Sequence, residues 1–242
     1  MLTSKDIQFF KANGYLIVEN LLTPEEVDDF RNIYEGFLAE KISTKGHRSD
    51  LSGLTQKGEK EKTTQIMRPS LLLKDLQKSV LHQRTKAIIQ ELLGADMDLD
   101  FDMMIDKAPH TNTPTPWHQD EAYWIDMPDK RAATCWVALD DVRKKNGCIW
   151  FVPKSHVEPL RPHQQTGKGG ALQCQADESE AIAAEIKAGS CTIHTGRTVH
   201  YARGNSTSTR RRAFICNFRP QEMIAYERAK GFDHLGKRAV RQ

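Results

Sequence analysis

The sequence contains no long hydrophobic run and shows no signal-peptide pattern at its start. Its longest apolar runs, such as Leu71–Leu73, are far shorter than the roughly 20 residues that a membrane-spanning helix needs. Residues 1–18 lack the basic, apolar and small-residue order of a secretory signal. We therefore expect no membrane partner and a cytoplasmic location.

Cysteine is sparse, and charge of neither sign dominates. The five cysteines include no Cys-x-x-Cys pair of the kind that binds structural zinc, so we expect reduced, mostly buried thiols. The 35 basic and 32 acidic residues leave a formal charge of +3, too even a balance to predict a nucleic-acid partner. One dense basic run, Arg210–Arg212, needs a local explanation. The cysteines are Cys135, Cys148, Cys174, Cys191 and Cys216.

The chain is long enough for one folded domain. Its 242 residues can bury one full-sized core, and contents of 38% hydrophobic and 28% charged residues are typical of a soluble globular protein. No break in composition requires a second domain. We predict a single domain over residues 1–242, with a helical region over about 1–95, a β-rich core over about 96–220 and a C-terminal helical tail.

The N-terminal third has helix signals. A helix is predicted over Ser4–Asn13, closed by Gly14 and followed by an apolar strand, Tyr15–Val18. Thr23 is a suitable N-cap for a second helix because Pro24 occupies its first position, and apolar residues then recur at helical spacing. We expect that apolar stripe to lie in the core.

Two segments lack strand or helix periodicity and are predicted to be surface loops. The first, Ile42–Lys62, is polar and follows the second helix. The second, Glu158–Ala184, lies between predicted strands, where loops commonly cover an active site. Either segment could act as a lid, and the second is expected to become ordered when substrate binds.

Beyond a third helix that ends at Gly94, the sequence changes to short apolar or alternating segments separated by turn residues. Several short strands after a helical preface favour a jelly roll or barrel with helices packed outside. The predicted fold class is thus mainly β with packed helices. The strands are expected near Leu99–Lys107, Trp117–Asp120, Ala132–Leu139, Cys148–Val152, Ser190–His194, Thr198–Tyr201 and Arg212–Phe218.

One strand carries a candidate metal site. In Trp117–Asp120 a single residue separates His118 from Asp120, so on an extended strand both side chains project from the same face and can bind one ion. A set of two histidines and one carboxylate leaves positions open on iron(II). The third ligand must come from elsewhere in the chain, and His200 and His194 are the candidates.

Three motifs together resemble the phytanoyl-CoA dioxygenase family. They are Trp117–Asp120, the stretch Asn146–His156, and the distal His200 with Arg211, and they occur in the family's order. The resemblance extends from about Phe10 to Pro220. It implies a double-stranded β-helix, that is, a jelly-roll, cupin-like core. It also implies an enzyme that uses iron(II), 2-oxoglutarate and O2 to oxidise a small molecule, with release of succinate and CO2.

The resemblance also implies roles for particular residues. The family's iron ligands correspond to His118, Asp120 and His200, and its 2-oxoglutarate-anchoring arginine corresponds to Arg211, which favours His200 over His194. Family residues beside the cosubstrate correspond to Trp136, Met103 and Gln65.

An arginine suits the distal carboxylate of 2-oxoglutarate because its planar fork makes two charge-assisted hydrogen bonds and stays protonated. Side chains alternate along a strand, so if Arg211 points into the barrel with Ala213 and Ile215, then Arg210 and Arg212 point outward.

The remaining histidines and tryptophans have simpler interpretations. His156 could orient a bound molecule or have a structural role. Trp124 and Trp150 are expected in the core rather than as substrate platforms. Solvent exposure is expected for His47, His82, His110, His163 and His234, which lie in polar contexts.

Three alternatives to a hydroxylating oxygenase remain at this point. An iron halogenase-like variant would have a small residue in place of the carboxylate, which Asp120 argues against. A non-catalytic metal- or ligand-binding relative would keep the barrel without oxidation, and a zinc or nickel cupin-type enzyme would use similar ligands. The substrate and the oligomeric state cannot be inferred from the sequence.

Overall fold

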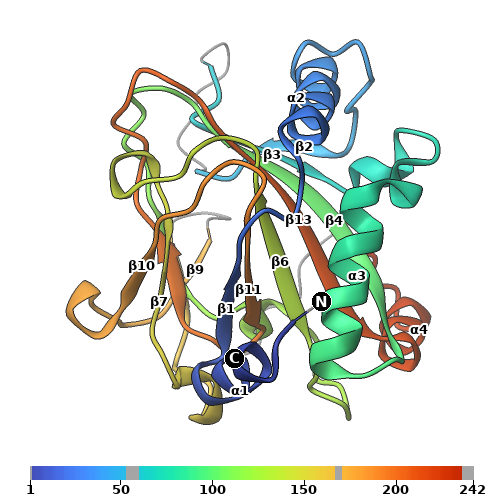
Figure 1. The fold of residues 1–242 in the computed structure, drawn as a ribbon, viewed down its shortest axis with the longest axis vertical. Helices are drawn as coiled ribbons and strands as arrows, with labels where there is room; N and C mark the ends of the chain where they lie inside the picture. Colours follow the sequence, from blue (N-terminus) through green and yellow to red (C-terminus); the bar gives the residue numbers. More distant parts are fainter. Residues whose placement is uncertain (1, 53–59, 167–170, 236–242) are drawn as a thin grey trace.

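A computed structural model describes residues 2–52, 60–166 and 171–235 (Figure 1). Parts of both predicted loops, residues 53–59 and 167–170, lie outside the described residues. No helix in the described ranges is long and apolar enough to cross a membrane.

The first two helices begin at residues that cap them. Thr3 and Thr23 each form a capping box, the first before α1 (Ser4–Asn13) and the second before α2, and Gly14 ends α1 with a φ of 78° that favours glycine. Both predicted N-terminal helices are confirmed. The four α-helices among the described residues are α1 (Ser4–Asn13), α2 (Pro24–Leu38), α3 (Val80–Leu93) and α4 (Gln221–Ala229).

A large antiparallel sheet forms one wall of the barrel. Its strand order is β1-β11-β6-β13-β4-β3-β2, so β13, the last strand in the described part of the chain, lies between β6 and β4 near the centre of the sheet. Its strands are β1 (Tyr15–Val18), β2 (Arg48–Asp50), β3 (Thr63–Met67), β4 (Met97–Lys107), β6 (Ala133–Ala138), β11 (Cys191–Thr195) and β13 (Arg211–Pro220).

A smaller antiparallel sheet, in the order β10-β7-β12-β5, forms the second wall. Its strands are β5 (Thr115–His118), β7 (Ile149–Phe151), β10 (Ile182–Ala184) and β12 (His200–Ala202). The short strands β8 (Gln164–Gln165) and β9 (Leu172–Gln173) form a separate antiparallel pair, and β9 lies beside β5 of the small sheet. Two antiparallel sheets with helices outside form the jelly-roll, cupin-like architecture that was predicted.

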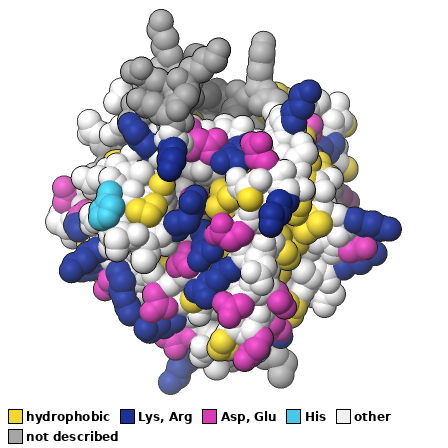
Figure 2. All heavy atoms as spheres, turned by 90° about the horizontal axis from the view of Figure 1, so that it is seen from above, with side chains coloured by type: hydrophobic (Ala, Val, Ile, Leu, Met, Phe, Trp, Pro, Cys, Tyr) yellow, Lys and Arg dark blue, Asp and Glu magenta, His cyan; other side chains and the backbone are white. Residues whose placement is uncertain are grey.

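The core has two main parts, one on each face of the large sheet. Helices α2 and α3 pack on the outer face, where Phe37, Leu81 and Phe214 belong to one apolar cluster, and Figure 1 shows α3 crossing this face. The inner face packs toward the small sheet, where Ile215 and Phe151 belong to one apolar cluster. On the surface in Figure 2, basic and acidic side chains alternate rather than gather by sign, in line with the nearly balanced composition.

Several predicted elements differ from the observed ones. The strand expected over Trp117–Asp120 ends at His118, and Asp120 begins a short 3-10 helix. The first predicted loop contains β2 and the second contains β8, β9 and β10, so both were wrong as wholly irregular segments. These strands have two to three residues each, too few to reveal a period of two in the sequence.

Candidate metal centre and pocket

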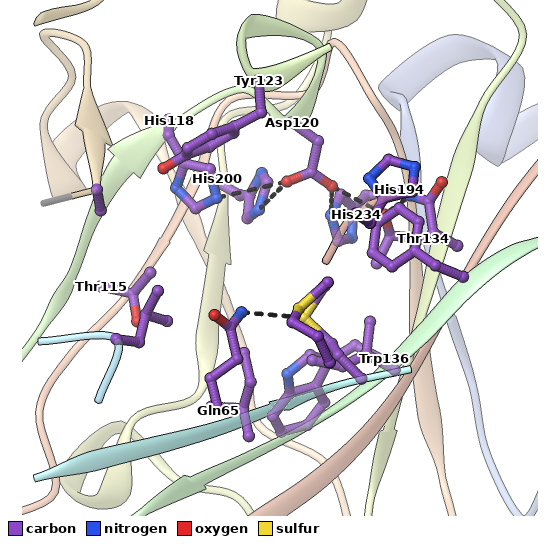
Figure 3. A pocket seen from close by; sticks show the side chains of 18 of the residues that line it. Gln65, Thr115, His118, Asp120, Tyr123, Thr134, Trp136, His194, His200 and His234 are labelled. Atoms are coloured by element: carbon purple, nitrogen blue, oxygen red, sulfur yellow. Dashed lines mark hydrogen bonds and ion pairs between the residues drawn. The ribbon is translucent and has the colours of Figure 1, made fainter. Parts of the chain in front are cut away.

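The small sheet brings two histidines together at the centre of the barrel (Figure 3). His118 is the last residue of β5 and His200 the first of β12, and the two lie opposite each other in the ladder. Nε2 of His118 lies 3.5 Å, and Nε2 of His200 3.7 Å, from the same oxygen, Oδ1 of Asp120. One ligand atom from each of the three lies within 4.8 Å of the others, so they can hold a metal ion.

Backbone carbonyls fix the tautomers of both histidines. Nδ1 of His118 lies 2.7 Å from the Pro116 carbonyl and Nδ1 of His200 lies 2.9 Å from the Thr198 carbonyl. A carbonyl only accepts hydrogen bonds, so each Nδ1 carries the proton and each Nε2 offers a lone pair toward Asp120. Burial holds the pKa of His200 well below its usual value, which keeps this imidazole neutral.

A relay from the large sheet orients the carboxylate. The Thr134 hydroxyl donates a 2.8 Å hydrogen bond to Oδ2 of Asp120, and the Asn217 amide donates a 2.9 Å bond to the Thr134 oxygen. Second partners of this kind fix ligand orientation in metal sites. Sequence reasoning missed both residues, since Thr and Asn are common and this pair is joined only by the β6–β13 register.

His194 lies on the other side of the same carboxylate. Its Nε2 is 3.3 Å from Oδ2 of Asp120, but neither of its ring nitrogens has a hydrogen-bond partner among the described residues. Its ring lies 4.2 Å from that of His200. The group whose atoms fit one ion consists of His118, Asp120 and His200 and does not include His194.

A buried lysine ties the two metal-site strands together. Nζ of Lys107 donates to the carbonyls of Thr113, before β5, and of Ala202 and Arg203, at the end of β12, at 3.0, 3.4 and 2.7 Å. Burial and nearby Arg211 hold the pKa of Lys107 well below its usual value. Lys107 therefore helps to keep His118 and His200 on neighbouring strands.

Arg211 lies at the start of β13, only 2% exposed, and lines the same pocket as the triad. Its Nε and Nη1 have no hydrogen-bond partner in the described part of the chain. The guanidinium carbon lies 5.0 Å from the centre of the Trp136 ring. Burial lowers the pKa of Arg211 to about 10, which still leaves it charged at neutral pH. A buried cation without an acidic partner fits an anionic ligand.

The other predicted pocket residues also line this cavity of about 160 Å³. Trp136 comes from β6 and Met103 from β4, while Gln65 comes from β3 and donates to the Met103 sulfur at 3.4 Å. All three therefore lie in the same pocket as Arg211 and the triad.

The predicted register of the arginine run is confirmed, but its outward members are not simply solvated. Arg212 pairs with Asp140 at 2.7 Å and Glu35 at 2.9 Å, and Arg210 pairs with the buried Asp106. In this run Arg211 faces the pocket, and the arginines on either side of it form ion pairs. The three arginines therefore do not form a basic surface patch.

The histidine expectations need correction. Of the five expected in solvent, only His110 is exposed. His82 is buried and lies 3.0 Å from Asp102, and His163 accepts from the Gln119 amide. His47 contacts a backbone carbonyl, and His234 is held by two carboxylates. Most of these partners lie 20 or more residues away in the sequence, which is why local polarity misled the prediction.

The histidine, cysteines and tryptophans without a predicted catalytic role have mainly structural contacts. Nε2 of His156 lies 3.1 Å from the Lys11 carbonyl, outside the pocket lining. The five cysteines are free and buried, as expected. Trp124 and Trp150 are buried as predicted, although Trp124 also lines the pocket.

A jelly roll with two histidines and a carboxylate on one wall, and a buried arginine in the same pocket, defines the class of mononuclear non-haem metal enzymes. The chain belongs to the phytanoyl-CoA dioxygenase (PhyH) family, whose sequence model matches residues 10–213. This family and its structural neighbours are iron- and 2-oxoglutarate-dependent oxygenases, which confirms the enzyme class, cofactor and co-reactants that the resemblance implied.

Individual relatives are distant in sequence but similar over most of their length. The chain is 25% identical to phytanoyl-CoA dioxygenase domain-containing protein 1 of Danio rerio, covering 92% of this chain and 91% of that one. It is 25% identical to a probable alpha-ketoglutarate-dependent hypophosphite dioxygenase of Stutzerimonas stutzeri, with coverages of 85% and 74%. The structure of EvdO2 from Micromonospora carbonacea var. aurantiaca, complexed with 2-oxoglutarate, superposes with a TM-score of 0.77 at 25% identity, covering 90% of this chain and 91% of that one.

Proposed function

We propose that this chain is a single catalytic domain that hydroxylates a small molecule and binds iron(II) through His118, Asp120 and His200. Arg211 binds the distal carboxylate of 2-oxoglutarate in this proposal. Trp136, Met103 and Gln65 form the walls around that cosubstrate. The observation that carries the proposal is the combination in one pocket of a metal-competent triad and a buried guanidinium. Its Nε and Nη1 have no hydrogen-bond partner among the described residues.

The donor set fits iron(II). Two neutral imidazole nitrogens and one carboxylate leave the ion one net positive charge and open positions on one side. The carbonyl contacts at both Nδ1 atoms hold the imidazoles with Nε2 toward the ion, and the Thr134 hydroxyl holds the carboxylate. With iron bound, the Asp120 carboxylate would take the position that a halide needs, which argues against a halogenase.

When bound, iron(II) with 2-oxoglutarate and O2 supplies the oxidising chemistry. The chain's own residues bind, orient and exclude water. Arg211 supplies a fixed fork for one carboxylate of the cosubstrate, because a guanidinium makes two parallel hydrogen bonds. The Trp136 ring beside it limits the orientations of that fork. The apolar walls at Ile105 and Ile215 keep water from the pair.

The test is iron-dependent release of succinate from 2-oxoglutarate, measured with iron(II), with zinc(II), and with a panel of small molecules. We expect turnover with iron only and stimulation by the true substrate. His118→Ala and His200→Ala should abolish turnover because each removes a metal ligand. His194→Ala is the matched control and should keep measurable turnover. Activity with zinc, or loss of iron from His194→Ala but not from His200→Ala, would contradict the assignment.

A further inference from the structure

The pocket continues beyond the triad to an end formed by the C-terminal segment. Strand β13 begins with Arg211 and reaches Arg219 near its other end. Between them, Asn217 contacts Thr134, which in turn contacts Asp120, so Asn217 marks the level of the triad. At about 3.3 Å per residue, Arg211 and Asn217 are roughly 20 Å apart along the strand. The pocket lining beyond this level includes His234 (labelled in Figure 3) and Phe232.

Several of these lining residues lie beyond the residues that the family model matches. The family match ends at residue 213, whereas α4 and the segment after it supply Glu227, Phe232 and His234 to the pocket. The far end of the pocket therefore includes residues that follow the matched range, whereas the triad and Arg211 lie within it.

His234 is held in place by two carboxylates. Its Nε2 lies 3.1 Å from Oδ2 of Asp100, on β4, and 3.0 Å from Oε2 of Glu227, on α4. Its ring packs on Phe101 with centroids 4.0 Å apart. Both carboxylates are acceptors, so Nε2 carries a proton that they share. Nδ1 makes no hydrogen bond to any residue in the described ranges, and the side chain remains 13% exposed.

The ion pairs around His234 carry one net positive charge when this imidazole is protonated. Asp100 also pairs with Arg219 at 2.7 Å and with Arg228, and Glu227 pairs with Arg228 at 3.1 Å. Two carboxylates are thus matched by two guanidiniums, and a protonated His234 adds one positive charge. Burial opposes that charge, but the hydrogen bonds to both carboxylates outweigh it and raise the pKa of His234 above its usual value.

A metal ion is a poor occupant of this cluster. One atom each from Asp100, Glu227 and His234 lies within 4.8 Å of the others, which is close enough for a shared ion. Arg219 and Arg228 already occupy the carboxylates, so a divalent cation would have to displace them and lie beside two guanidiniums. The cluster is better explained as an ion-pair network that presents an imidazolium to the pocket.

We propose that His234 is a specificity-determining residue that binds an anionic group of the substrate, a carboxylate or a phosphonate, at the end of the pocket opposite Arg211. This proposal rests on the proposed function, because it places the substrate beyond the metal from the cosubstrate. Phe101, Phe232 and Trp124 line the same end, so the rest of the substrate should be largely apolar.

The test is nuclear magnetic resonance of the full chain with isotope-labelled histidine, recorded with saturating 2-oxoglutarate so that Arg211 is occupied. The probes are isobutyrate, methylphosphonate and the neutral isostere isobutyramide. We expect a saturable shift of the His234 ring signals with one or both anions, and the tighter anion identifies the group recognised. The His234→Gln variant should bind that anion roughly tenfold more weakly or worse, the loss of one charge-assisted hydrogen bond. His110→Gln, at an exposed histidine outside the pocket, is the matched control and should bind normally.

Equal binding of isobutyramide, or no saturable response to either anion, would overturn the proposal. So would a zinc(II) titration in which a second equivalent shifts the His234 signals, because the cluster would then be a metal site. The wild-type response separates this idea from the proposed function. Anion binding at His234 without iron-dependent succinate release would support the anion site and reject the proposed function. Succinate release without anion binding at His234 would support the proposed function and reject the anion site.

Discussion

Replacing Arg211 by methionine should change the stability of the protein in opposite directions without and with 2-oxoglutarate. Without it, the wild-type chain keeps a 2%-exposed guanidinium whose Nε and Nη1 have no hydrogen-bond partner among the described residues. A buried unsatisfied polar group costs about 1–3 kcal/mol. Methionine removes that cost and fills much of the same volume, but gives up the cation–π contact with Trp136, worth about 0.5–2 kcal/mol. We expect a net gain of about 1 kcal/mol, or about 2–4 °C in melting temperature.

With 2-oxoglutarate the order should reverse. Truncating one partner of a buried charge pair costs about 2–5 kcal/mol, which is a loss of affinity of roughly 30-fold or more. At a concentration of about 100 times the wild-type dissociation constant, the wild-type protein gains about 2.7 kcal/mol. The variant gains at most about 0.9 kcal/mol at the same concentration, because its ratio of ligand to dissociation constant is then only about three.

The assay is thermal unfolding over a series of 2-oxoglutarate concentrations, with iron(II) and without oxygen. Arg212→Met is the matched control, since Arg212 is ion-paired with Asp140 and Glu35 outside the pocket. That variant should melt lower than the wild type and respond normally to 2-oxoglutarate. The reasoning is refuted if Arg211→Met melts lower without 2-oxoglutarate and keeps the full shift. A lost shift in Arg212→Met instead would mean that the wrong arginine was assigned.

Two further predictions concern the groups around the pocket. Thr134→Val should weaken iron(II) binding about 10- to 100-fold, because it removes the hydroxyl that orients Asp120; a chelator competition that returned wild-type affinity would contradict this. For Asp100, burial opposes ionisation, but His234, Arg219 and Arg228 lower the pKa to about 2, below the usual value of about 3.9 in an unfolded chain. Its contribution of roughly 2–3 kcal/mol is therefore present above about pH 4 and lost as the pH falls toward 2. Urea unfolding at pH 5 and pH 3 should show a smaller loss of stability for Asp100→Asn than for the wild type, and equal losses would disprove the assignment.

The sequence was informative where chemistry and spacing coincide within a short motif. His118 and Asp120 could be recognised together because one residue separates them, even though the strand that was expected to align them ends at His118. The resemblance singled out Arg211, and alternation along a strand predicted its inward direction, which holds for β13. Gly14 at the end of the first helix, and Thr23 with Pro24 at the start of the second, placed these two helices correctly.

What could not be predicted depends on contacts between distant segments. Asp100 and His234 are 134 residues apart, and neither lies in a recognisable motif. The Thr134–Asn217 relay requires the pairing of β6 with β13, which the sequence does not specify. A polar neighbourhood in the sequence therefore suggested solvent for His234, whereas two buried carboxylates surround it in the fold.

The position of β13 has a consequence for how the protein is made. This strand is the last one among the described residues, yet it lies between β6 and β4 and carries Arg211 at its start. Synthesis proceeds from the N-terminus, so β4 and β6 are made before β13. Their facing edges stay unpaired until β13 is added between them. Closure of the sheet and delivery of Arg211 are therefore the same late event. A chain that stops before residue 211 would lack both the closed sheet and Arg211. Such a product should expose the unpaired edges of β4 and β6 and should not bind 2-oxoglutarate.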